Sequence, residues 1–268
     1  MSYAKIILTL LIFLCMQVMG GFGVVLIMDG AGAAEATGLD PDIVASMSIL
    51  SGLLSIFAVK YGLKTINLRQ TVSLGTMRSE LSKSDIKAPA VLLALLGTTS
   101  ALFGANLLNE IIPLPDNMEE PFTVMAARPL GILSICVVAP FVEELIFREG
   151  IAGYMLRHGA APLSAIICSS AAFGLMHLNP AQIPFAFLIG LVLAVLYWRT
   201  RSIWLPLIMH IINNTMAVVL MNTCDEELSS LLGLSLPATI TLTVLSIAAS
   251  VALLTPFCRS GRNASAGA

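Results

Sequence analysis

Charged residues are scarce in this sequence. Only 11% of the 268 residues are Asp, Glu, Lys or Arg, whereas a soluble domain carries about 25%. Hydrophobic residues make up 57% of the chain, and its mean hydropathy is +0.91. The length alone would suggest one or two soluble domains. The long apolar runs exclude that reading and predict a polytopic membrane protein.

Other common signals are also missing. The five cysteines are scattered, and no two of them form a metal-type pair, so they are expected to be small buried hydrophobic residues. The zinc-binding pattern His-Glu-x-x-His does not occur. None of the apolar runs alternates with the period of two that a barrel strand would show. A β-barrel is therefore excluded, and an all-α fold is expected.

The apolar runs predict about eight transmembrane helices. We see no internal repeat and no second soluble domain. We divide the chain into residues 1–124 with about three spans, a catalytic core at 125–222, and a final span with a short tail at 223–268. The predicted spans cover residues 5–28, 42–62, 88–112, 128–157, 160–178, 182–199, 202–222 and 232–257.

The distribution of charge orients these spans. Segments 29–42, 110–120 and 225–227 hold eleven of the sixteen acidic residues and no basic ones. The alternate segments hold thirteen of the fourteen basic residues, many of them between Lys60 and Lys87. Basic residues concentrate in short cytoplasmic loops. We therefore expect both termini and a loop at about 63–87 in the cytoplasm, with the protein in the cell membrane.

Four charges lie within seven positions of the predicted fourth span: Glu143, Glu144, Arg148 and Glu149. Each charge at the centre of a spanning helix costs roughly 2.5–3.5 kcal/mol, so such a cluster indicates a functional site. Glu144 and Arg148 lie one helical turn apart and can pair. That pair alone would be a structural link between helices. The pair does not include Glu143, whose side chain is therefore expected to contact a residue of another helix.

Two of the three histidines also lie in apolar segments. His177 precedes Asn179-Pro180, which should end its helix. His210 and Asn214 are four residues apart and face the same way. Either feature alone would be ordinary packing or interhelical hydrogen bonding. The rough heights of these residues along their spans are compatible with one shared polar pocket that also holds Glu143.

Three short motifs in this order resemble those of the CPBP intramembrane proteases, also called the Abi or CAAX-protease family. That family includes the Ras-converting CAAX prenyl endopeptidases. The resemblance covers about residues 125–222, and the spans before it carry no usable motif. The motifs are Glu143-Glu144-x-x-x-Arg148, Phe173-x-x-x-His177 and His210-x-x-x-Asn214.

The resemblance implies an intramembrane endopeptidase. In that family the first glutamate, here Glu143, activates a water molecule with help from the histidine that is here His177. The third motif, here His210 and Asn214, is assigned to stabilising the oxyanion. A carboxylate in a low-dielectric pocket suits a general base, and imidazole and amide groups suit an oxyanion site. Glu144, Arg148 and Phe173 would then support these four residues.

Partners and cofactors follow from the same interpretation. We expect contact with membrane lipids, a membrane-associated peptide or protein substrate that could be prenylated or lipid-linked, and no nucleic acid. No obligatory metal is expected. Zinc bound by Glu143, His177 and His210 is the alternative.

Two other classes of function stay open. A membrane scaffold or bacteriocin-immunity protein would use the same fold without cleavage. It would not need Glu143 in addition to the pair of Glu144 and Arg148. A transporter or proton relay also uses intramembrane Glu and His. The sequence lacks the repeats and broken helices typical of transporter sites, and Pro140 and Pro206 are expected to kink their helices.

Overall fold

Helices make up nearly all of the described chain. The computed structural model describes residues 2–30, 40–83, 86–112, 114–223 and 227–259, with the backbone alone for residues 21–30. No strand occurs in these ranges. The all-α prediction is therefore confirmed.

Seven helices in the described ranges are long and apolar enough to cross a membrane. Their composition confirms the prediction of a multi-pass membrane protein. They are α1 (Tyr3–Gly30), α2 continued by η1 (Pro41–Ala58 and Val59–Leu63), α5 (Ala88–Ile111), a composite helix (Pro129–Arg157), α11 (Ile183–Thr200), α12 (Trp204–Thr223) and α14 (Leu236–Arg259).

The remaining helices are short. Among them, α4 has no fully buried residue and occupies the predicted loop at 63–87. The short helices are α3 (Leu68–Thr71), α4 (Leu74–Lys83), α6 (Glu119–Ala126), α10 (Pro162–Leu175) and α13 (Leu228–Leu231).

The predicted span at 160–178 is shorter than expected. Helix α10 has 14 residues, about 21 Å at 1.5 Å per residue, whereas the hydrocarbon core is about 30 Å thick. The helix ends at Leu175, two residues before His177. Leu178 then adopts a left-handed conformation with φ of 53°, and Pro180 prevents the helix from resuming. The expectation of eight full-length spans was therefore wrong for this one.

The turn after α10 is held by a strap, which we define as residues 114–118 between α5 and α6. The side chain of Asn179 is fully buried. It donates to Asp116 Oδ1 at 2.8 Å and accepts from the Asn117 backbone at 3.2 Å. The Ala181 N–H donates to the Pro115 carbonyl at 3.2 Å. Backbone groups that leave a helix inside a bilayer need protein partners, and the strap supplies them.

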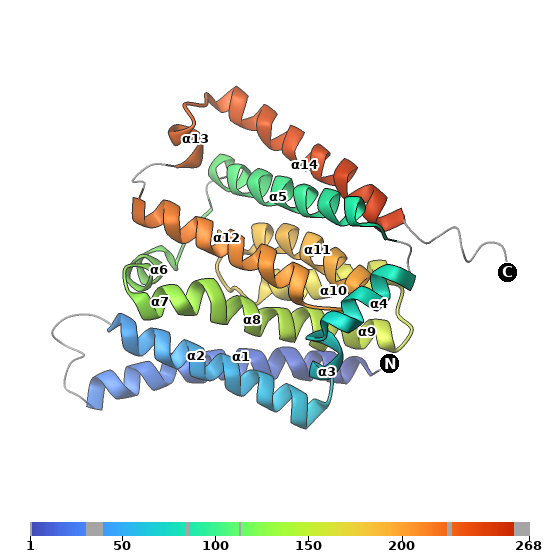
Figure 1. The fold of residues 1–268 in the computed structure, drawn as a ribbon. Helices are drawn as coiled ribbons and strands as arrows, with labels where there is room; N and C mark the ends of the chain where they lie inside the picture. The colour runs from blue at the N-terminus through green and yellow to red at the C-terminus, as the bar shows by residue number, and fades with distance from the viewer. Residues whose placement is uncertain (1, 31–39, 84–85, 113, 224–226, 260–268) are drawn as a thin grey trace.

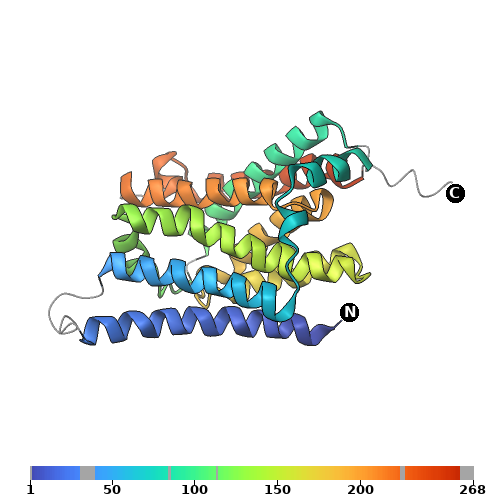
Figure 2. The same cartoon turned by 60° about the horizontal axis from the view of Figure 1, so that its bottom comes forward.

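The helices lie roughly parallel in a bundle (Figure 1). The α1–α2 pair forms one edge and the α5–α14 pair forms the other, with the composite helix and α12 between them. Helices α10 and α11 pack behind these two. Figure 2 shows the same order after rotation, with α1 at the outer edge. The composite helix is therefore flanked on both sides.

The composite helix is unusual in its winding. It consists of α7 (Pro129–Leu133), η2 (Ser134–Val138), α8 (Ala139–Glu143), η3 (Glu144–Gly153) and α9 (Tyr154–Arg157). The η2 and η3 segments are π-helical, and the Ala139 N–H bonds to the Ser134 carbonyl five residues back. Pro140 has no N–H to donate to the preceding turn. Wide turns of this kind occur mostly at functional sites, and Glu143 lies midway along this helix.

Small residues let α5 and α14 approach closely. A Cβ at Gly97 would lie 3.2 Å from the Ser250 carbonyl oxygen, and one at Gly104 would lie 3.1 Å from Ser246 Cβ. Ser100 also donates to the Ser246 carbonyl at 2.8 Å. Close contact through small residues drives helix association in lipid, where burial of apolar area supplies no net force.

The positions of the two chain ends agree with an even number of crossings, which are the seven long helices together with the shorter α10. The start of α1 at Tyr3 and the end of α14 at Arg259 lie on the same side in both views (Figures 1 and 2). Helix α4 lies at this same end (Figure 1). The cytoplasmic location of this end stays a prediction from the basic residues.

The topology can be tested with reporter fusions. Fusions after residue 35, which lies outside the described residues, and after residue 75 should report opposite sides, with residue 75 cytoplasmic. The reason is that one apolar span separates them. Alkaline phosphatase and fluorescent-protein fusions provide the measurement. Reports from the same side for both fusions would contradict the assignment of the first two spans.

Candidate active site

Two neighbouring glutamates have different environments. Glu144 is fully buried. Its Oε2 lies 3.1 Å from Arg148 Nε, and its Oε1 lies 2.9 Å from His210 Nδ1. The Glu143 side chain is 19% exposed, and its Oε2 lies 3.5 Å from His210 Nε2. Glu144 is therefore held on two sides, whereas the contact of Glu143 with His210 is longer.

Arg148 forms the ion pair expected from its spacing to Glu144. Its side chain has no exposed surface. The guanidinium lies over the ring of Phe173, 4.4 Å from its centroid. Among the described residues, the terminal nitrogens of the guanidinium have no hydrogen-bond partner. The ion pair and the ring face therefore provide the stabilising contacts of this buried cation.

Phe173 connects the residues of the three motifs. Its ring is 2% exposed. The ring lies 4.8 Å from that of His177 and 5.5 Å from that of His210, edge to face in both cases. The structure thus brings α10, α12 and the composite helix together around the side chain of Phe173. The composite helix carries Glu143, Glu144 and Arg148.

His210 lies between the two carboxylates and is 3% exposed. An ionised carboxylate can only accept a hydrogen bond, so Nδ1–H of His210 donates to Glu144 Oε1. In the neutral ring Nε2 then carries a lone pair. In the charged ring Nε2–H faces Glu143 or a substrate oxygen. We assigned these protons from the hydrogen-bond partners.

His177 is also held through Nδ1, but its partner is a backbone carbonyl. Its Nδ1 lies 2.8 Å from the Phe173 carbonyl oxygen, which fixes the proton on Nδ1. Nε2 of the neutral ring is then free to accept a proton. Position 177 lies in the turn after α10, where the ring is half-buried.

Asn214 lies one turn after His210 on α12. Its Nδ2 donates to the Ile135 carbonyl at 3.0 Å in the composite helix, and its Oδ1 accepts from Asn213 at 3.2 Å. An amide nitrogen carries two N–H groups. One of them ties α12 to the wide π turn, and the other remains available to an oxyanion.

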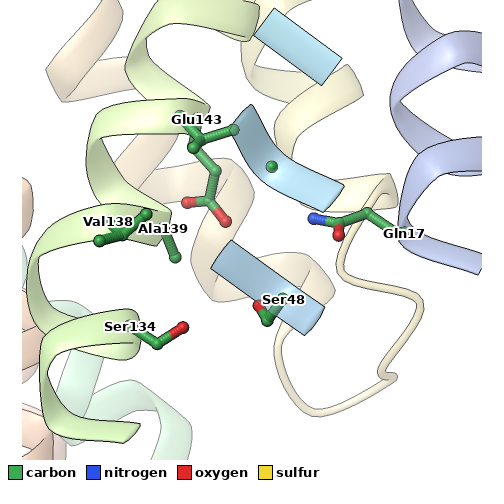
Figure 3. A pocket seen from close by; sticks show the side chains of 8 residues that line it. Gln17, Ser48, Ser134, Val138, Ala139 and Glu143 are labelled. Carbon is green, nitrogen blue, oxygen red and sulfur yellow. The ribbon is translucent and has the colours of Figure 1, made fainter. Parts of the chain in front are cut away.

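A pocket opens beside Glu143 (Figure 3). It is lined by Gln17 of α1, Ser48 and Gly52 of α2, and five residues of the composite helix: Ser134, Val138, Ala139, Val142 and Glu143. The predicted site contained only Glu143 among these. A glutamine in the middle of the first apolar run was the signal that could have revealed Gln17. Ser48 and Ser134 carried no comparable signal.

Glu149 lies in a second buried cluster that the sequence did not assign. Its carboxylate is 1% exposed. It pairs with Arg157 at 2.5 Å, accepts from the Asn67 backbone at 3.0 Å and accepts from the Tyr197 hydroxyl. A Cβ at Gly153 would overlap that hydroxyl, so glycine is needed there. This cluster ties the composite helix to α11 and to the chain before α3.

The proposed zinc ligands do not form a ligand group in the structure. Within the described ranges, no three side chains of His, Cys, Asp or Glu are close enough together to hold a metal ion. Nδ1 of His210 faces Glu144, which leaves only Nε2 beside Glu143. Glu143, His177 and His210 thus do not form a three-ligand group in this arrangement, and the expectation that no metal is obligatory stays a prediction.

The fold and the site define a class of protein: a multi-pass helical membrane protein with a carboxylate and histidine site inside its bundle. Residues 125–216 match the family model of the Type II CAAX prenyl endopeptidase Rce1-like proteins. The resemblance carried by the three motifs is thereby confirmed, and residues 125–216 form an Rce1-like region. This region begins at the last two residues of α6 and contains the whole composite helix, α10, α11 and most of α12.

Two curated relatives carry related names. The chain is 29% identical over 158 residues to the "Putative membrane peptidase YdiL" of Bacillus subtilis (strain 168), covering 56% of this chain and 64% of that protein. It is 27% identical over 108 residues to the membrane-embedded CAAX protease MroQ of Staphylococcus aureus (strain USA300), covering 38% and 44%. The matches thus span less than two thirds of either relative. No solved structure matches the chain.

Proposed function

We propose that this protein is an intramembrane endopeptidase that hydrolyses a peptide bond of a membrane-associated substrate with water activated by Glu143. The proposal rests mainly on the different environments of the two adjacent glutamates. A structural role would require only Glu144, which is buried and bound by Arg148 and His210. Glu143 instead lines a pocket, is partly exposed and makes a longer contact with His210, an environment that suits a general base.

The chemistry assigns a role to each residue. Glu143 takes a proton from water, and the oxygen adds to the carbonyl carbon of the substrate. His177, with its accepting Nε2, assists this proton transfer. His210 and the second N–H of Asn214 stabilise the oxyanion in a site sheltered from bulk water. The proton then moves to the leaving amine as the C–N bond breaks.

The remaining motif residues hold this site in place. Glu144 fixes the ring of His210, and Arg148 fixes Glu144. Phe173 spaces the two histidines. The proposed catalytic core comprises residues 125–222. Prenylated or lipid-linked peptides are the proposed substrates because the site lies at membrane depth and the matched family takes its name from prenyl endopeptidases.

Purified protein in detergent tests this proposal. We expect wild-type protein to cleave peptides from libraries of prenylated and unprenylated sequences, detected by mass spectrometry. Cleavage should persist after dialysis against a chelator because the site residues do not form a metal-ligand group. A zinc enzyme would lose activity and regain it when zinc is added. Wild-type protein that cleaves no peptide under any of these conditions would contradict the peptidase assignment.

A further inference from the structure

The pocket beside Glu143 contains polar groups that the motifs do not explain. Gln17 lies midway along α1, outside the residues that match the family model. A carboxamide that faces hydrocarbon without partners is costly. Gln17 Oε1 accepts from Ser51 Oγ at 2.8 Å. Its amide nitrogen points across the pocket toward the carboxylate of Glu143 (Figure 3).

The size and lining of the pocket suit an ordered water molecule. Its free space is about the volume that one water needs. Ser134 directs its hydroxyl into the same space, and Ser48 lies on the wall formed by α2 (Figure 3). Gln17 is exposed and Ser48 is half-buried, so the pocket is partly open on the side of α1 and α2. An ordered water makes about three hydrogen bonds, and the amide, the hydroxyl groups and the carboxylate offer that number. The pocket is too small for a peptide.

We propose that this pocket holds the hydrolytic water and that Gln17 binds it for Glu143. The inference rests on the proposed peptidase function and adds α1 and α2 to its site. Glu143 Oε2 lies beside His210, which leaves Oε1 to accept from the water. Gln17 donates to the water oxygen from the α1 side. One water proton moves to Oε1 of Glu143, the oxygen adds to the substrate carbonyl carbon, and the proton later moves to the amine that leaves.

The first test removes the amide with little change of shape. In Gln17→Met the water loses one donor, and kcat should fall by roughly ten- to hundred-fold while KM stays unchanged. Asn106→Leu is the matched control. It also removes an amide at membrane depth, and Asn106 bonds only within α5 at the far edge of the bundle. This control should retain wild-type kcat. Melting temperatures verify that both variants fold.

The second test measures water in the pocket without using activity. Ser48→Cys, in a background without the five native cysteines, should react rapidly with a charged thiol reagent, because only a hydrated thiol ionises. Leu50→Cys is the control, since Leu50 lies two residues away on the exposed face of α2 and would face lipid. Its reaction should be at least ten times slower.

The outcomes separate this inference from the proposed function. Wild-type kcat in Gln17→Met, from a protein that cleaves peptide, would overturn the role of Gln17 and leave the peptidase assignment intact. Equal labelling of Ser48→Cys and Leu50→Cys would overturn the hydrated pocket. Failure of wild-type protein to cleave would overturn the peptidase assignment and the catalytic role of Gln17, while the labelling rates would still decide whether water occupies the pocket.

Discussion

Glu143→Gln is expected to abolish peptide cleavage, with a loss of about a hundred- to ten-thousand-fold, the contribution of a positioned general base. The amide keeps the shape of the side chain but cannot accept the proton from water. The protein should still fold because the side chain is 19% exposed and its charged neighbour lies 3.5 Å away. Cleavage by the purified variant, measured by mass spectrometry beside its melting temperature, provides the test.

The matched control is Glu80→Gln. Glu80 pairs with Lys83 on the exposed face of α4, so the same change of charge there should leave cleavage unchanged. His177→Ala and His210→Ala should also abolish cleavage. Asn214→Ala should retain residual activity, because one lost oxyanion donor costs about a hundred- to a thousand-fold. The losses should not add, since the residues act together.

Other functions would give other results. A scaffold or immunity protein would keep its phenotype in cells that carry Glu143→Gln. A proton relay would change proton flux across liposomes and cleave nothing. A fully functional Glu143→Gln strain, together with a wild-type protein that cleaves no peptide, would refute the peptidase proposal.

Arg148→Ala is expected to have the largest effect on stability, about 3–5 kcal/mol, because it leaves the buried carboxylate of Glu144 without its cation. Both side chains of this pair have no exposed surface. The change also removes the guanidinium from the ring of Phe173. Lower yield and a lower melting temperature of the purified variant would show the loss.

A double variant separates lost charge from lost packing. Glu144→Gln with Arg148→Met keeps an acceptor for His210 and fills most of the volume of the arginine. It should recover much of the stability, since replacing both members of a buried pair is often neutral. Glu143→Gln should cost far less than Arg148→Ala. Equal losses in those two variants would mean that Glu143 is structural.

The spans could be predicted from sequence because long apolar runs have few alternatives in a bilayer. The charged cluster was visible for the same reason: four charges in such a run are costly. The one-turn spacing of Glu144 and Arg148 correctly indicated their contact. The catalytic roles of Glu143, His177, His210 and Asn214 stay predictions, although the structure places both histidines against Phe173 and Glu143 beside His210.

What the sequence did not reveal depends on contacts between distant segments. The early end of α10 requires the strap, and no local pattern indicated that Asp116 would bind Asn179. The π turns rotate the residues that follow them by a fraction of a helical turn. The spacing of a regular α-helix therefore does not predict which way those side chains face. The partners of Glu149 come from three elements. Gln17 was visible as a polar residue in an apolar run, but its neighbour Glu143 is 126 positions away.

The shortness of α10 has a consequence for the surrounding lipid. Leu163, Ile167 and Leu175 on this helix are exposed, so acyl chains must cover a helix about 21 Å long next to helices of about 27 Å or more. A bilayer meets such a mismatch by thinning locally. The headgroup layer is therefore drawn inward beside the turn that carries His177. We therefore expect a thinner bilayer beside α10 than beside the longer helices on the other sides of the bundle.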